Sequence, residues 1–338
     1  MKRLDFKTLQ RESQEKWRET NISTQENGWQ NGKNYSHIIP SKDWKENLWE
    51  DIRTTLPEYL EKNDVKEHTG VHNLLSSWIV CANLYFPIKY NEQLKHLFVN
   101  FLQTKISTEI TEILDIQLEF AFEESSDLHP SKLLGEHGGS KGSGQTSPDV
   151  AFIVKTSSGG NGLVLCENKY TEHSFYSCSA RKVNKKVDRT NNPNPERCMN
   201  SCNFDFKEIC HQFVWGRQYL SLVEFSEEAK MKLKRCPAAT AGYQLLRQQA
   251  LAEGIAKSRD YEIVVSVVAF DERNTDLINC LSSTGINDFQ INWADMFNGK
   301  AKFQTWTHQE WVQFVRNRQS SNGFVKKWLT YLQDRYQY

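Results

Sequence analysis

Two carboxylates and a lysine lie one hairpin's length apart near the middle of the chain. Asp149 follows a proline, and Glu167-Asn168-Lys169 begins 18 residues later. Glu167 and Lys169 are two residues apart, so on a strand their side chains point to the same face. Carboxylates are the usual protein ligands of Mg²⁺, and a neighbouring lysine can stabilise the charge that develops on a phosphoryl group. These residue types at this spacing therefore predict Mg²⁺-assisted hydrolysis of a phosphodiester bond.

The segment between Asp149 and Glu167 has the composition of a β-hairpin. VAFIV (150–154) is rich in β-branched and aromatic residues, TSSGGNG (156–162) is a dense turn signal, and a second apolar run leads to Glu167. Antiparallel pairing of the two strands would bring Asp149 beside Glu167. The alternative is a surface hairpin with ordinary charges, because E-x-K is common by chance.

A third carboxylate is expected beside the first two. ILDIQLEFAFEE (113–124) alternates like a strand, and in a meander its end lies beside the start of the next strand. Glu123 is closest to the predicted strand end, so we favour it. Glu119 shares its face, and Glu136 lies in the glycine-rich loop that follows. For each of the three, a solvated surface charge is the alternative.

The hairpin belongs to a mixed pattern of helices and strands. Apolar residues at helical spacing predict helices over 70–87 and 91–104 before the strands, and over 206–224 after them. YEIVVSVVAFDE (261–272) predicts a buried strand, and Gln309–Arg318 predicts one of several late helices. The order helix, strand, strand, strand, helix, strand indicates a mixed α/β core with helical additions at both ends.

The same pattern divides the chain into three predicted regions. They are a helical N-terminal lobe (1–69), a core with a cysteine-rich insertion at 171–210 (70–275), and a helical C-terminal extension (276–338). Thr171, His173, Ser174 and Tyr176 directly follow Lys169 and are expected to line the site.

Composition limits the partners and the location that are expected. The 338 residues carry a formal net charge of zero, so no global field attracts a polyanion, and DNA contacts would depend on local basic runs such as Arg181–Lys186. No apolar stretch is long enough for a membrane span, and the first residues do not resemble a secretory signal. A cytoplasmic location without membrane contact is therefore expected, with cysteines as reduced thiols or metal ligands.

Four cysteines are concentrated in the polar insertion. Cys178, Cys198, Cys202 and Cys210 fall within a segment with too few apolar residues to form its own core. A structural metal would explain how such a segment is ordered. Four thiolates suit Zn²⁺ or an iron–sulfur cluster, and the spacing matches no short zinc-finger pattern. A segment without any metal is an equally weighted alternative.

Pro148-Asp149 followed by Glu167-Asn168-Lys169 resembles the motif of the PD-(D/E)xK nuclease superfamily. The longer text from SPDVAFIV to GLVLCENKYTEHSF (147–175) resembles a restriction-endonuclease-like branch of that superfamily. The helix at 72–87 and the Phe122-Glu123 strand end resemble the same branch, so the similarity covers roughly residues 70–275. In some RecB-type members a cysteine cluster brackets the nuclease core, but here all four cysteines follow the E-x-K strand.

This resemblance implies both a fold and an activity. The fold is a restriction-endonuclease-like αβββαβ core with a mixed sheet. The activity is DNA cleavage dependent on Mg²⁺ or Mn²⁺, with Asp149 and Glu167 as metal ligands and Lys169 as the catalytic lysine. The leading hypothesis is an endonuclease of restriction or phage-defence type, acting as a homodimer or with a partner subunit. Alternatives are an exonuclease or junction-resolving nuclease on the same core, or a non-catalytic DNA-binding module.

Overall fold

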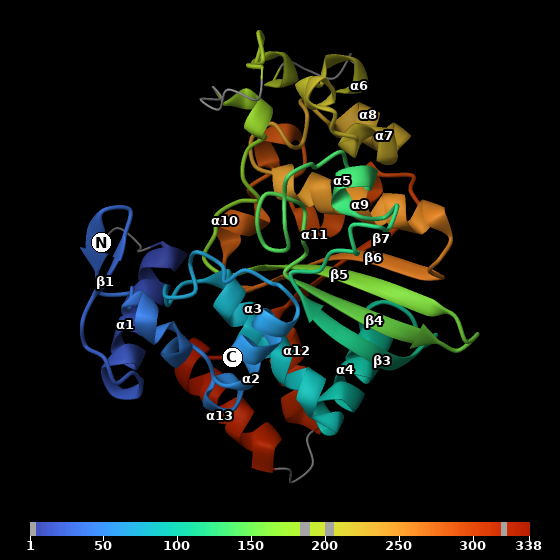
Figure 1. Cartoon of the computed structure of the whole chain (residues 1–338). Helices are drawn as coiled ribbons and strands as arrows, with labels where there is room; N and C mark the ends of the chain where they lie inside the picture. Colours follow the sequence, from blue (N-terminus) through green and yellow to red (C-terminus); the bar gives the residue numbers. More distant parts are fainter. Residues whose placement is uncertain (1–4, 183–189, 200–205, 319–322) are drawn as a thin grey trace.

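A five-stranded mixed sheet forms the centre of the computed structural model, which describes residues 5–182, 190–199, 206–318 and 323–338 (Figure 1). The strand order is β3-β4-β5-β6-β7, which follows the order along the chain. Their bounds are Ile110–Leu118, Val150–Thr156, Asn161–Lys169, Ile263–Phe270 and Lys302–Thr307.

The sheet combines an antiparallel meander with two parallel strands. β3, β4 and β5 pair antiparallel, and β5, β6 and β7 pair parallel. The β4–β5 turn contains Gly159 at φ 92°, a left-handed conformation that favours glycine. Every residue of β6 is buried, as is typical of a parallel strand that is covered on both faces.

Alternate residues of the central strands enter two separate hydrophobic cores. Val150 and Phe152 belong to the first core, whereas Ala151, which lies between them in the sequence, belongs to the second. Each core is covered by its own group of helices, so the molecule has a helix–sheet–helix arrangement (Figure 1).

The helices over the first core come from both ends of the chain (Figure 1). They are α1 (Phe6–Asn21), α2 (Thr55–Lys62), α3 (Ser77–Tyr85), α4 (Glu92–Lys105), α12 (His308–Arg318) and α13 (Gly323–Tyr336). Helices α1 and α13 contact each other, and the Gln14 side chain donates to the Arg335 carbonyl at 2.8 Å. A short hairpin, β1 (Gly28–Gln30) and β2 (Lys33–Tyr35), and the 3₁₀ turns Ser41–Asn47, Glu50–Ile52 and Phe86–Tyr90 complete this side.

The second core is covered mainly by the connection from β5 to β6 and by the segment that follows β6. The longest helix there is α9 (Tyr243–Ser258), which packs directly on β6. The shorter helices are α5 (Pro130–Leu133), α6 (Phe206–Ile209), α7 (Tyr219–Leu222), α8 (Glu227–Lys232), α10 (Thr275–Ile278) and α11 (Phe289–Asn292). Single 3₁₀ turns occur at Ser179–Arg181, Arg197–Met199, His211–Trp215, Ser282–Thr284 and Ala294–Met296.

The predicted fold class is confirmed, and three details of the predicted elements are corrected. β3 ends at Leu118, five residues before Glu123, because the chain turns at Glu119 with φ 50°. The helix predicted over 206–224 is broken into short pieces, and the chain is left-handed at Gly216. β7 was not predicted, and it lies in the region expected to be a helical extension. The three-region division itself stays a prediction.

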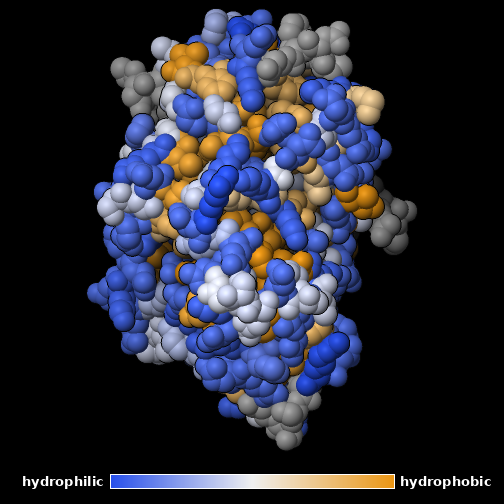
Figure 2. All heavy atoms as spheres, turned by 90° about the vertical axis from the view of Figure 1, so that its right-hand side faces the viewer, coloured by the Kyte–Doolittle hydropathy of each residue, from blue (hydrophilic) through white to orange (hydrophobic). Residues whose placement is uncertain are grey.

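The outer surface is dominated by polar side chains. The face in Figure 2 is mostly hydrophilic, and hydrophobic side chains show between the hydrophilic ones. Across the part of the chain that the structure describes, no helix combines the length and the apolar character that crossing a bilayer requires.

Candidate active site

The pairing register of the sheet brings three acidic residues together where neighbouring strands end. Val150 pairs with the last residue of β3 on one side and with Cys166 of β5 on the other. Glu119, Asp149 and Glu167 are the next residues beyond these pairs, and the Glu119 N–H donates to the Asp149 carbonyl at 3.0 Å. The antiparallel hairpin therefore places Asp149 beside Glu167, as the sequence predicts.

A backbone turn and a glycine position Glu119. Its φ of 50° ends β3 and keeps its side chain at the site, where it is 4% exposed. The glycine-rich loop passes close to it, since a Cβ on Gly142 would lie 3.3 Å from the Glu119 carboxyl carbon. Gly142 also has a left-handed φ of 76°, so a larger residue there would be strained as well as crowded.

Lys169 forms a buried ion pair with Glu167. Lys169 Nζ donates to Glu167 Oε1 at 2.7 Å, so the two side chains share a face of β5, as predicted from their spacing. Burial alone would lower the pKa of Lys169, but the nearby carboxylates of Glu167, Glu172 and Asp149 outweigh it and raise the pKa. Lys169 is therefore a permanent cation at physiological pH and cannot act as a general base there.

The other two carboxyl groups are held in an environment that opposes their charge. Burial raises the pKa of Glu119, and the negative charges of Asp149 and Glu167 raise it further. Burial followed by the charge of Glu167 raises the pKa of Asp149 in the same way, more than Lys169 lowers it. The ionised forms of these carboxyl groups therefore lack sufficient opposite charge, which a bound cation would supply.

The donor atoms of this cluster are all oxygens, which suits a hard divalent cation. Within the described ranges, no three His, Cys, Asp or Glu side chains already surround a common metal position. Two of the carboxylates point instead to other partners: Glu167 to Lys169 at 2.7 Å, and Asp149 Oδ2 to the Asn168 N–H at 2.6 Å. The cluster thus has suitable ligands, with Glu167 and Asp149 held by protein hydrogen bonds.

Asn168, between Glu167 and Lys169, fixes this strand end from the opposite face of the sheet. Its side-chain Nδ2 donates to the Ser77 carbonyl at 2.8 Å, and its Oδ1 lies 2.9 Å from His308 Nε2. His308 Nδ1 lies 2.8 Å from the Tyr338 hydroxyl. A neutral His308 that donates from Nε2 and accepts from Tyr338 satisfies both contacts. The first turn of α12 and residue 338 therefore help to hold the site in place.

Because His308 is buried in its neutral form, we predict a specific pH dependence of stability. Burial lowers the pKa of His308 from 6.5 to about 3. Between these two pH values His308 is protonated in the unfolded chain but not in the folded chain, so the free energy of unfolding falls as the pH drops from 6.5 toward 3. A His308→Gln variant should lose less stability than the wild type between pH 7 and pH 4, as measured by urea unfolding at each pH. Parallel curves for the two proteins would contradict the buried neutral imidazole.

Three further side chains surround Lys169, of which only Tyr176 was predicted. Lys169 Nζ lies 6.0 Å from the centre of the Tyr176 ring. The Glu172 carboxylate accepts from the Tyr170 N–H at 2.9 Å and from the Ser77 hydroxyl at 2.5 Å. His68, in the loop after α2, lies within electrostatic reach of Glu172, Lys169 and Glu167. The position of Glu172, three residues after Lys169, could have indicated from the sequence that it lies near the site. No local pattern connects His68 to this strand.

The preference for Glu123 as the third carboxylate is corrected by its position. The Glu123 side chain is 85% exposed and lies 3.9 Å from Lys141, outside the cluster. The strand prediction extended β3 to residue 124, whereas the chain leaves the sheet at Glu119. Glu119, which was the alternative on the same predicted face, is the residue that lies beside Asp149.

Glu136, the other candidate, anchors the glycine-rich loop instead. It accepts from the backbone and hydroxyl of Thr146 and from the Tyr219 hydroxyl. Arg247 of α9 donates to Glu136 at 3.1 Å and lies over the rings of Tyr219 and Tyr243. This buried ion pair closes the loop at its base and fixes it to the helix that packs on β6.

The cysteines of the insertion lie on the side of the second core. Cys178, Cys198 and Cys210 are joined there by Cys236, whose N–H donates to the Cys198 carbonyl at 3.1 Å. Burial raises the pKa of all four thiols. Cys202 lies outside the described residues, and the described cysteines form no arrangement that could hold a metal. A Zn²⁺ or iron–sulfur staple stays a prediction.

The basic run Arg181–Lys186 is only partly within the described residues. Arg181 donates to the Pro195 and Ala239 carbonyls at 3.2 and 3.1 Å and pairs with Glu196 at 2.8 Å. Residues 183–186 lie outside the described ranges. The Arg181 guanidinium therefore links parts of the insertion to each other and to Ala239. A role of this basic run in DNA binding stays a prediction.

One of the comparisons with known proteins identifies a family for this chain. The model of a family described as Restriction Endonuclease associating with ARP matches residues 10–337. Comparison with the curated proteins and with the solved structures returned no significant match. The match extends from α1 to the penultimate residue, so it includes both groups of helices and the whole sheet. The chain belongs to this restriction endonuclease family, and its predicted likeness to restriction-endonuclease-like nucleases is confirmed.

Proposed function

We propose that the protein is a divalent-cation-dependent DNA endonuclease of restriction type that acts in defence against foreign DNA. The observation that carries the proposal is the cluster of Glu119, Asp149, Glu167 and Lys169 at adjoining strand ends. It supplies oxygen ligands for a cation and a permanent positive charge for a phosphate within one buried site. Membership of a restriction endonuclease family supports the same reaction.

Glu119, Asp149 and Glu167 are the residues that would hold Mg²⁺ or Mn²⁺. When bound, the cation would polarise the phosphoryl group and lower the pKa of a nearby water. The reaction adds water across a phosphodiester bond and gives a phosphate monoester and a free hydroxyl. Buried carboxyl groups need a cation to stabilise their ionised forms before a polyanion can bind beside them, so we propose that the cation precedes DNA.

Lys169 would stabilise the negative charge that builds up on the phosphoryl oxygens. Its Nζ is already charged and is oriented by Glu167 at 2.7 Å, so little reorganisation is needed at the moment of reaction. The Asn168 N–H holds Asp149 in position, and the Asn168–His308 contact holds Asn168. The E-x-K strand end would therefore act as a rigid unit.

The proposal includes a protein partner. The matched family is described as associating with ARP, and we propose that this chain acts with a partner subunit or as a homodimer, since the chain has no formal net charge to attract DNA. A non-catalytic DNA-binding module remains the second candidate function. A pure binder has no need for a buried lysine among buried carboxylates, and this argues for catalysis.

Cleavage of supercoiled and linear plasmid with Mg²⁺ or Mn²⁺ tests the proposal, with the wild type assayed beside Asp149→Ala. We expect the wild type alone to nick or linearise the supercoiled form, which requires internal cleavage. Digestion of linear DNA only would indicate an exonuclease. Equal digestion by both proteins would indicate contamination, and absence of cleavage by the wild type with intact plasmid and modified phage DNA would contradict the proposed activity.

Glu119 gives a separate prediction about the third carboxylate. Glu119→Gln keeps the side chain's shape but removes its charge, so we expect cleavage to fall by roughly 100-fold or more and the Mg²⁺ concentration for half-maximal activity to rise. Glu112→Gln, an exposed position on the same strand, is the matched control and should cleave like the wild type. Wild-type cleavage by Glu119→Gln would exclude Glu119 from the site.

A further inference from the structure

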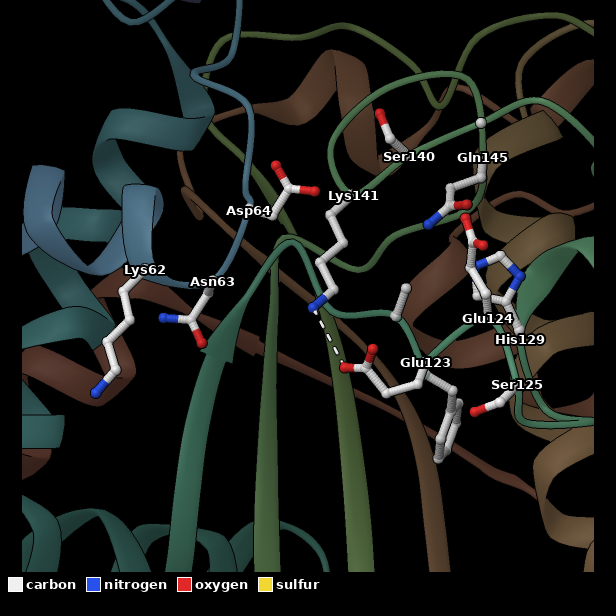
Figure 3. Close-up of a pocket in the computed structure, with 13 residues that line it drawn as sticks. Lys62, Asn63, Asp64, Glu123, Glu124, Ser125, His129, Ser140, Lys141 and Gln145 are labelled. Carbon is white, nitrogen blue, oxygen red and sulfur yellow. Dashed lines mark ion pairs between the residues drawn. The ribbon is translucent and has the colours of Figure 1, made fainter.

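A cavity of about 580 Å³ is lined in part by the chain that leaves β3 after Glu119 (Figure 3). Its walls come from three separate segments: the end of α2 with the residues after it, the chain that leaves β3, and the glycine-rich loop. The residues that line it are Lys62, Asn63, Asp64, Ala121, Phe122, Glu123, Glu124, Ser125, His129, Gly139, Ser140, Lys141 and Gln145. Its volume is within the range of pockets that bind small organic groups.

Two segments of the cavity wall also approach Glu119. Phe122 in its wall is three residues from Glu119, a separation of at most about 11 Å even for a fully extended chain. Gly142, which lies against the Glu119 carboxyl group, belongs to the same loop as Ser140 and Lys141 in the opposite wall. A nucleic acid strand with a phosphate at Glu119 would therefore place a neighbouring nucleotide at the cavity.

The charges of the lining oppose a phosphate in the cavity itself. Asp64, Glu123 and Glu124 place three carboxylates there against two lysines, Lys62 and Lys141, one of which lies 3.9 Å from Glu123. The remaining groups are amides, hydroxyls, an imidazole and an aromatic ring. Such a set suits an uncharged, flat, heteroaromatic ligand with hydrogen-bonding edges.

Gln145 provides a polar group without a partner in the cavity wall. It is 8% exposed, and its Oε1 is buried without any hydrogen bond. In Figure 3 its amide extends from the loop into the space beside the Glu124 and His129 side chains. A buried amide oxygen without a partner is costly, so a ligand towards which the Gln145 amide turns would relieve that cost.

The loop that carries Gln145 is held rigidly. Its base is closed by Glu136 and Arg247, and the backbones of Ser140 and Ser143 pair at 2.7 and 2.9 Å. A Cβ on Gly139 would lie 2.6 Å from the Gln145 Cβ, so the loop approaches Gln145 as closely as glycine allows. The position of the Gln145 Cβ is therefore set by the loop before any ligand binds.

We propose that this cavity receives an unstacked nucleobase of the substrate strand and that the Gln145 amide reads the edge of that base. Asn63 on the opposite side carries a second amide, and the half-buried Phe122 ring offers a surface for stacking. Placing a base outside the helix costs stacking energy, which the ring and the amide hydrogen bonds offset. The inference rests on the proposed nuclease function and adds to it a base-specific contact next to the scissile phosphate.

Fluorescence of 2-aminopurine tests this proposal, because the base is quenched when stacked in DNA and bright when unstacked. The cleavage position is first mapped with the wild type, and duplexes are then made with 2-aminopurine at each of the nearest nucleotides on both sides. Each duplex is titrated with Asp149→Asn and Mg²⁺, with binding followed separately by anisotropy. We expect a several-fold rise in fluorescence at one position, which Gln145→Leu in the same background reduces.

Gln244→Leu is the matched control, since Gln244 also has a buried, unpartnered amide oxygen but does not line the cavity. In the otherwise wild-type enzyme, Gln145→Leu should reduce cleavage at the preferred base by roughly tenfold or more and Gln244→Leu should not. Saturated binding without a fluorescence rise, or the same rise with Gln145→Leu, would overturn the cavity proposal alone. A wild type that neither binds nor cleaves DNA would overturn the proposed function as well.

Discussion

Replacing Asp149 by asparagine is expected to abolish DNA cleavage and to raise the melting temperature of the cation-free protein. Burial and the charge of Glu167 raise the pKa of Asp149 well above 3.8, so its ionised form opposes folding. Asparagine has no charge to bury, and its Oδ1 can still accept the Asn168 N–H. The cleavage rate should fall by at least about 100-fold, because a cation ligand is lost.

The gain in stability should depend on pH in a defined direction. A carboxyl group with a raised pKa supports folding while it is protonated, and this support is lost as the pH rises through the folded-state pKa. The difference in melting temperature between Asp149→Asn and the wild type should therefore be small near pH 4 and grow above it. At neutral pH in EDTA we expect an increase of roughly 2–5 °C, measured by differential scanning calorimetry.

Asp115 on β3 is the matched control for this variant. Burial raises the pKa of Asp115, but the hydrogen bonds from Lys89 and Gln117 lower it by more, so the pKa lies below its usual range. Its ionised form therefore stabilises the fold above that range, and Asp115→Asn should lower the melting temperature at neutral pH while cleavage continues. A destabilised Asp149→Asn protein, or one that still cleaves, would remove Asp149 from the proposed cation site.

Replacing Lys169 by methionine is expected to remove cleavage while the protein stays folded. The methionine side chain fills much of the same space, but the positive charge near the phosphoryl oxygens is lost, and this should cost roughly 100- to 1,000-fold in rate. Breaking a buried ion pair is also destabilising, typically by about 3 kcal/mol, because Glu167 loses its partner at 2.7 Å. Single-turnover cleavage, circular dichroism and urea unfolding measure the two effects separately.

Two companion variants separate chemistry from folding in this experiment. Lys169→Arg keeps the charge and should fold, but its planar guanidinium changes the geometry, so cleavage should still be much reduced. Lys155→Met, at the other end of the β4–β5 hairpin, should cleave like the wild type. If Lys169→Met and Lys169→Arg both unfold, or if either cleaves normally, the role of Lys169 is structural.

Local sequence information was sufficient for the hairpin that carries the site. The turn residues and the apolar runs on either side set the β4–β5 register. Glu167 and Lys169 lie on one face because they are two residues apart on a strand. These are short-range effects, because neighbouring strands and side-chain alternation depend only on residues close together in the chain. The mixed α/β class followed from the order of such patterns along the chain, the restriction-endonuclease-like core followed from the family resemblance, and both were confirmed.

The third carboxylate depended on a backbone conformation that side-chain patterns do not encode. Residues 113–124 alternate as if one strand continued through them, but Glu119 adopts φ 50° and ends β3. The Glu119 side chain lies against a loop more than 20 residues away, where Gly142 leaves room for the carboxyl group. The choice between Glu119 and Glu123 was therefore made by tertiary packing.

The sequence by itself determined the E-x-K hairpin, the mixed α/β core and the oxygen and ammonium groups available for chemistry. Only the tertiary structure decided which other residues surround them: His68 and Glu172 near Lys169, and His308, which contacts both Tyr338 and Asn168. The physical reason is that strand pairing follows local periodicity, whereas contacts across the sheet depend on how helices from both ends of the chain pack against it. The same packing created the cavity beside Glu119, which no sequence motif marks.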